Sequence, residues 1–269
     1  MAGFDFGLVI CNEEYEPRMK EVMPGATLDN LPTVKPDRQK MVTRLGKGFS
    51  YNFDLMGAFS KNDFDCSKTE IDENYENIDD IDFAVKMFVK NLKGQVERVS
   101  GKGVCIDYLL FYFLGHGCTI QGKDCLLGVN GHPYPVNSLL EQLITLKFNK
   151  LIMILDCCRN NIGLTTFHTD KTEEIQAQLD HVDKLTLSYD KVTRIYSAQE
   201  GHKATDMAGA TFADVLDELL SALPEGVDEE KLQRILNEKW GRLQRERHMK
   251  GRYKCQVKPA TQSHFRCFP

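Results

Sequence analysis

Two short segments of the chain hold residues whose types and spacing allow covalent chemistry. Residues 115–117 read GHG and residues 156–160 read DCCRN, and each segment directly follows an apolar stretch. A cysteine thiolate is a strong nucleophile near neutral pH, and a nearby imidazole can take the thiol proton and return it to a leaving amine. His116 and Cys158 therefore predict acyl-transfer chemistry by a cysteine–histidine pair.

The choice between the two adjacent cysteines follows from strand geometry. Side chains alternate across a strand, so Asp156 and Cys158 are expected on one side and Cys157 on the other. We assign Cys158 as the nucleophile and Cys157 as a small buried hydrophobic residue. His116 is flanked by glycines whose amides can approach a ligand, which suits a base beside an oxyanion site. A capping or core histidine is the alternative interpretation of the same residue.

A metal site is the competing interpretation of these segments. A tetrahedral zinc set would draw on His116, Cys118, Cys157 and Cys158. Adjacent cysteines that point apart rarely chelate one ion, and the chain has no CxxC pair. The acidic run from Asp63 to Asp82 lacks the spacing of a calcium-binding loop and favours a solvated face. We therefore predict no metal and no cofactor.

Alternating strands and helices are predicted to position the two reactive segments. Apolar runs of strand length cover residues 6–11, 104–114, 150–155 and 192–197, with a further strand predicted at 49–53. Helical apolar spacing covers residues 37–45, 81–94, 139–146, 212–223 and 232–243. This order predicts an α/β fold with a mainly parallel sheet and helices on both faces. Because the carboxyl ends of parallel strands meet at one edge, both reactive segments are expected to face one crevice.

The chain has 269 residues and no visible internal repeat, so we predict a single domain over residues 1–269. A polar stretch at about 161–190 shows no strong apolar period. We predict a long loop there, between the two halves of the domain, of the kind that is functional or cleaved.

Composition excludes several classes of protein. The formal net charge is -5, and no basic cluster is long enough to follow a phosphate backbone, which argues against nucleic-acid binding. The longest strictly apolar run, Tyr108–Leu114, is far shorter than the roughly 20 residues that span a membrane. Asp5 stands where a signal peptide needs a basic residue, and the 9 cysteines are an odd number. We expect free thiols and a cytoplasmic protein.

The two reactive segments resemble those of the caspase-like cysteine peptidases. FYFLGHG at 111–117 is similar to the histidine motif of that family, and LIMILDCCRN at 151–160 is similar to its cysteine strand. The likeness continues in FGLVICNEEY (6–15), PDRQKM (36–41) and IYSAQEGHKATD (195–206). It implies a caspase-like three-layer sandwich with a mainly parallel central sheet. Asp156, two residues before Cys158, makes the chain most similar to paracaspases and less so to metacaspases.

The resemblance also implies a substrate preference. It places Asp37, Asp156 and Asp206 in the pocket for P1, the residue on the amino side of the scissile bond. Three carboxylates attract a cation, so the implied P1 residue is basic, with arginine preferred over lysine because its planar fork can bond two carboxylates. The alternative for each aspartate is a helix-cap or turn role.

The resulting hypothesis is a cysteine endopeptidase that acts on proteins or peptides through an acyl-enzyme. His116 and Cys158 form the dyad, and the amides of Gly117 and Cys158 stabilise the oxyanion. The substrate main chain is expected beside Ser197 and Ala198, and a two-fold homodimer through residues 253–268 is a family expectation. A caspase-like scaffold with weak or lost activity that acts by protein binding is the second hypothesis, and a redox or zinc protein is the third.

Overall fold

The computed structural model describes most of the chain. The described residues are 3–15, 19–23, 28–48, 80–99, 105–201, 204, 211–222, 229–246 and 255–258. The strand predicted at 49–53, Asp206 and nearly all of the acidic run before Asp82 lie outside these residues.

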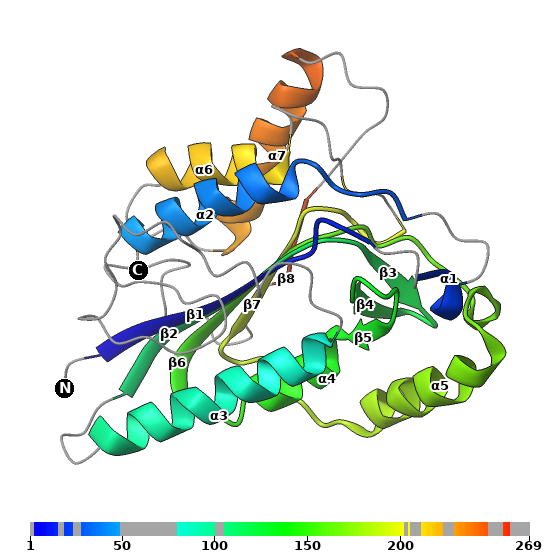
Figure 1. Cartoon of the computed structure of the whole chain (residues 1–269). Helices are drawn as coiled ribbons and strands as arrows, with labels where there is room; N and C mark the ends of the chain where they lie inside the picture. The colour runs from blue at the N-terminus through cyan, green and yellow to red at the C-terminus, as the bar shows by residue number, and fades with distance from the viewer. Residues whose placement is uncertain are drawn as a thin grey trace.

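A mainly parallel sheet forms the centre of the fold, as the sequence predicts. Its strands are β1 (Gly3–Cys11), β2 (Cys105–Leu114), β6 (Phe148–Asp156), β7 (Val192–Tyr196) and β8 (Gln256–Lys258), in the order β1-β2-β6-β7-β8. The first four run parallel, and β8 pairs antiparallel with β7. The runs are continuously apolar because helices cover both faces of the sheet (Figure 1).

Alternate side chains of β2 build two separate cores. Leu109, Phe111 and Phe113 pack on the face covered by α3 (Ile81–Val99) and α4 (Val136–Leu143). The residues between them, such as Tyr112, pack on the opposite face. That face is covered by α2 (Val34–Gly48), α6 (Phe212–Ala222) and α7 (Glu229–Glu246). This arrangement confirms the predicted three-layer sandwich (Figure 1).

A small antiparallel sheet beside the central one was not predicted. It consists of β3 (Gly117–Ile120), β4 (Lys123–Leu127) and β5 (Pro133–Pro135), in that order. Gln121 and Gly122 join β3 to β4 with φ of 50° and 76°, the positive values that a tight two-residue hairpin turn requires. Strands of three to five residues carry too little alternation to be recognised from sequence.

The prediction of a long loop at about 161–190 is wrong. The structure places a 3₁₀ turn at Leu164–Thr166 and the helix α5 at Thr169–Lys184 in this stretch. Ile175, Leu179 and Val182 form the buried stripe of α5, and the first two pack on the small sheet. Three apolar residues in a mostly charged helix give a weak periodic signal, which explains the error.

The remaining predicted helices are confirmed with shifted ends. α3 continues past Gly94 to Val99, and α4 begins three residues before its predicted start. The short helix α1 (Met19–Val22) was not predicted. No helix in the described part of the chain is long and apolar enough to cross a membrane.

The two phenylalanines of α3 test the assignment of its buried face. Phe88 is fully buried, whereas Phe83 is 56% exposed on the same helix. Phe88→Ala is expected to lower the free energy of unfolding by about 3–5 kcal/mol, because it removes a large core side chain and leaves a cavity. Phe83→Ala is expected to change it by less than about 0.5 kcal/mol. Urea unfolding of both variants checks this, and equal losses would contradict the assignment.

Candidate active site

Two adjacent strands deliver the reactive segments to one edge of the sheet. The parallel register sets Leu114, the last residue of β2, opposite Asp156, the last residue of β6. Past the strands, the amide of Gly115 donates to the carbonyl of Asp156 at 3.2 Å, so the two chains stay side by side. His116 and Cys158 consequently line the same cavity of about 400 Å³.

His116 is held by contacts of its backbone and its ring. Its amide donates to the hydroxyl of Tyr15 at 2.6 Å, and the rings of Tyr15 and His116 meet edge to face at 4.4 Å. The His116 Nε2 atom lies 2.8 Å from the carbonyl oxygen of Asp29. A carbonyl can only accept, so this contact assigns the proton to Nε2 and leaves Nδ1 as the basic nitrogen of a neutral ring.

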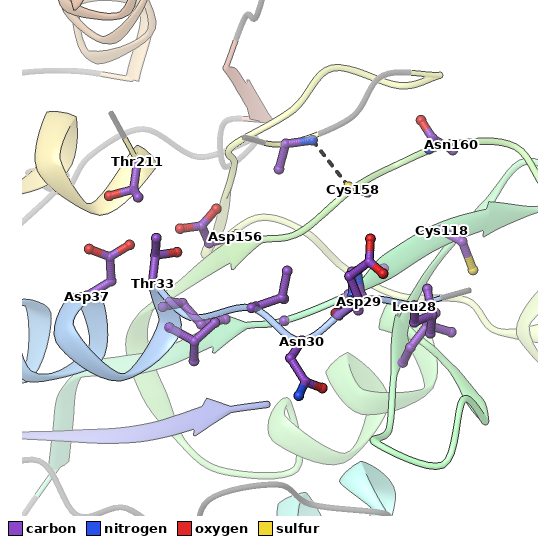
Figure 2. A pocket seen from close by; sticks show the side chains of 18 of the residues that line it. Leu28, Asp29, Asn30, Thr33, Asp37, Cys118, Asp156, Cys158, Asn160 and Thr211 are labelled. Carbon is purple, nitrogen blue, oxygen red and sulfur yellow. Dashed lines mark hydrogen bonds between the residues drawn. The ribbon is translucent and has the colours of Figure 1, made fainter. Parts of the chain in front are cut away.

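The two adjacent cysteines point to opposite sides, as the alternation predicts. Cys157 is 4% exposed and belongs to the core on the α3 face. Burial raises its pKa well above the ordinary value, so it stays a thiol. Cys158 is half-buried, lines the cavity, and its Sγ accepts a hydrogen bond from the amide of Ala204 at 3.3 Å (Figure 2). An N–H donor favours a thiolate more than a thiol.

The glycine after His116 is required by a close approach of two chain segments. A Cβ atom at Gly117 would lie 2.7 Å from the Sγ atom of Cys157 and 2.9 Å from the carbonyl oxygen of Cys158. Any side chain there would push the segment that carries Cys157 and Cys158 away from the histidine segment. The glycine thus sets the distance between the two segments as well as freeing a backbone amide.

Carboxylates gather at one end of the same cavity. Asp37, on the first turn of α2, and Asp156 both line it, together with Thr33 and Thr211 (Figure 2). Burial raises the pKa of Asp37 from 3.8 to about 6, although the Thr211 hydroxyl and the Lys40 ammonium oppose this rise. Asp37 is therefore mostly ionised at neutral pH, and the cavity presents negative charge.

Comparisons with known proteins show the family to which this fold belongs. A family model described as a caspase domain matches residues 5–266. The chain belongs to the caspase domain family. Among solved structures, the caspase domain is similar to the crystal structure of caspase-1 from Spodoptera frugiperda, with 11% identity, a TM-score of 0.57, and coverage of 96% of this chain and 87% of that one. No curated protein matches. Family membership makes the chain a relative of cysteine peptidases.

In this caspase domain, Ser197 and Ala198 lie beside the segment that carries Cys157 and Cys158, outside the cavity. Both are 1% exposed. The amide of Ser197 donates to the carbonyl of Leu155, and its hydroxyl donates to the carbonyl of Cys157 at 3.5 Å. The structure gives these residues a supporting role, and their contact with substrate stays a prediction.

The sequence analysis missed the residue that anchors the cysteine segment, residues 156–160. Arg159 follows Cys158 and is 1% exposed. Its guanidinium makes two hydrogen bonds to the Asp124 carboxylate on β4, at 2.9 and 3.0 Å, and stacks on the Tyr196 ring at 4.1 Å. It also donates to Gln256 on β8. One side chain thus ties the cysteine segment to both sheets. Nothing in the sequence around Arg159 indicates that its charged side chain is buried.

Metal binding finds no support in the described residues. No group of three or more His, Cys, Asp or Glu side chains among them could hold an ion. Of the zinc candidates, Cys118 is 3% exposed and pairs across the hairpin with Cys125, while Cys157 lies in the core. His116, Cys118 and Cys158 line one cavity, whereas Cys157 belongs to the core on the α3 face.

Thiol alkylation tests the assignment of Cys158. Iodoacetamide is expected to modify Cys158 at least about tenfold faster than the buried thiols of Cys11, Cys118, Cys125, Cys157 and Cys255, since those are shielded in the folded state. Timed labelling followed by peptide mass mapping measures each site. Equal rates at Cys157 and Cys158 would contradict the assignment.

The Arg159 anchor makes a prediction about stability. Asp124→Asn is expected to lower the free energy of unfolding by about 3–5 kcal/mol, because a buried guanidinium loses its counter-charge. Asp183→Asn is the matched control. Asp183 forms an ion pair at 3.0 Å with Lys123, the residue before Asp124, but its side chain is 64% exposed. This substitution should lower the free energy of unfolding by less than about 1 kcal/mol. Chemical denaturation of both variants decides the matter, and a small loss at Asp124 would refute the anchoring role.

Proposed function

We propose that this caspase domain is a cysteine endopeptidase that cleaves proteins or peptides after a basic P1 residue. The observation that carries the proposal is the shared cavity, where His116 and Cys158 lie with the carboxylates of Asp37 and Asp156. A nucleophile, a base and an acidic side-chain pocket are the parts that such a reaction needs.

The roles of the dyad follow from its contacts. The carbonyl of Asp29 fixes the His116 tautomer, so Nδ1 can accept the Cys158 proton. The thiolate then attacks the carbonyl carbon after P1 and forms a tetrahedral intermediate. The protonated imidazole gives its proton to the leaving amine, and the same base activates the water that hydrolyses the acyl-enzyme.

The amides of Gly117 and Cys158 are the proposed oxyanion donors. Both residues line the cavity, and the absence of a side chain at Gly117 lets the two segments lie in contact. Preorganised N–H donors stabilise the developing charge, and loss of one such donor costs about 10² to 10³ in kcat in related chemistry.

The acidic end of the cavity supports selection of a cation. Asp37 and Asp156 supply two carboxylates, and Asp206 is a third candidate that lies outside the described residues. A guanidinium that enters this end recovers Coulomb energy in a partly desolvated site, whereas an aspartate side chain would be repelled. Arginine is the preferred P1 residue because it can bond both carboxylates at once.

Assembly and location are further parts of the proposal. β8 is paired on one side only among the described strands, which suits a two-fold homodimer that joins residues 253–268 of two copies. The described cysteines are free, which suits a reducing, cytoplasmic location.

Cleavage of fluorogenic peptides tests the proposal. Peptides with Arg, Lys or Asp at P1 are to be compared, with the protein at high concentration and with and without calcium. We expect cleavage after Arg, weaker cleavage after Lys and none after Asp, and we expect Cys158→Ala to lose at least about 10³ of the rate.

Cys255→Ala is the matched control, because it removes a fully buried thiol on the α7 face and should keep the activity. Cleavage after Asp would refute the acidic pocket. Unchanged turnover in Cys158→Ala would refute the nucleophile. Silence toward every peptide in all conditions would favour a caspase-like scaffold.

A further inference from the structure

The acidic end of the cavity has a cation of its own. Lys40, one helical turn after Asp37 on α2, places its Nζ atom 3.6 Å from the Oδ1 atom of Asp37. The same ammonium forms a hydrogen bond with the carboxylate of Asp214 on α6. Asp37 lines the cavity and Lys40 does not, so the ammonium contacts the carboxylate from outside the space that a substrate would fill.

Asp214 is itself fixed by the start of α6. Its Oδ2 atom accepts from the amide of Thr211 at 3.0 Å and from the Thr211 hydroxyl at 3.1 Å. In return, the Thr211 hydroxyl oxygen accepts from the amide of Asp214 at 3.3 Å, a reciprocal cap of the helix. Burial opposes ionisation of Asp214, but hydrogen bonds from Lys40 and Thr211 outweigh it and lower the pKa of Asp214. Asp214 is therefore ionised at neutral pH and pairs with the Lys40 ammonium.

Groups on four elements lie around Asp37. Lys40 faces it from α2, Asp214 from α6 and the Tyr112 hydroxyl from β2, and Asp156 shares the cavity from β6. The Lys40 ammonium therefore serves two carboxylates, those of Asp37 and Asp214. Without it, these carboxylates would repel one another in a buried site, and Asp37 would take up a proton near neutral pH.

We propose that Lys40, held by Asp214, is a positioning residue that keeps Asp37 ionised and open to a basic P1 side chain. This inference rests on the proposed function and names what sets its specificity. Because Asp214 shares the ammonium, Lys40 stabilises the ionised form of Asp37 and leaves its carboxylate able to bind the P1 side chain of a substrate.

Removal of Lys40 and removal of Asp214 are expected to weaken cleavage in ways that the pH dependence distinguishes. Lys40→Met leaves Asp37 without its cation, so cleavage after Arg should fall about threefold at pH 6.5 and recover at pH 8.5. Asp214→Asn frees the ammonium to pair with Asp37, so KM for an Arg substrate should rise at least about fivefold at every pH with little change in kcat. Lys40→Arg, which keeps the charge, should restore most of the wild-type profile.

Full pH profiles of kcat and KM for the Arg and Lys peptides measure these effects. Lys35→Met is the matched control, since Lys35 is an exposed lysine on the same helix and should leave the profile unchanged. A pH profile of Lys40→Met that superimposes on the wild type would overturn the proposal. So would a fall that is equal at all pH values and accompanied by a lowered melting temperature.

A titration separates this inference from the proposed function. The Asp37 carboxyl carbon can be followed by NMR in the full chain carrying Cys158→Ala, with the signal assigned by its loss in Asp37→Asn. We expect its midpoint to rise by at least about one pH unit when Lys40→Met is added. An unchanged midpoint overturns the inference whatever the activity. A raised midpoint in a protein that cleaves no basic peptide overturns the proposed function and upholds the charge coupling.

Discussion

The parallel pairing of β2 with β6 is the constraint on which the site depends. It sets Leu114 opposite Asp156, so the histidine segment and the cysteine segment leave the sheet at the same height. The period of two along β6 then sends Cys157 into one core and Cys158 toward the cavity. A shift of one residue in this register would exchange the two cysteines and bury the thiol of Cys158.

Burial of the Asp37 carboxylate has an energetic cost. Asp37 is held in the folded chain with a pKa near 6 against 3.8 ordinarily, which corresponds to roughly 3 kcal/mol of lost stability above pH 6. The sign follows from linkage, since the folded state binds the proton more tightly and stability falls as pH rises from about 4 through 6. Arg159 is the opposite case, because its bonds to Asp124 satisfy the charge and fix the loop beside the nucleophile.

The features found from sequence are those with a strong local signal. Continuous apolar runs predicted the parallel strands. The GHG and DCCRN segments predicted where His116, Cys157 and Cys158 lie relative to the sheet. α5 was missed because its apolar stripe is three residues, and β3 to β5 because each strand is short. The backbone carbonyl of Asp29 and the hydroxyl of Tyr15 were missed because they act through position, which residue type does not reveal.

The contacts of Arg159 and Lys40 were equally hidden, because each joins elements that are far apart in the chain. Arg159 reaches 35 residues back to Asp124 and 97 residues forward to Gln256, and Lys40 reaches 174 residues to Asp214. Single-sequence patterns report local periodicity and local motifs, whereas such pairs depend on the tertiary fold. The placement of His116 and Cys158 at one edge of the sheet was therefore predictable, and the long-range contacts that hold the two segments there were not.

The most direct test of the central claim is a crystal structure of the protein after reaction with a peptidyl acyloxymethyl ketone that carries arginine at P1. We predict a thioether at the Sγ atom of Cys158 and the guanidinium between the carboxylates of Asp37 and Asp156. Attachment at another cysteine, or an arginine side chain that lies outside the acidic end of the cavity, would contradict the account.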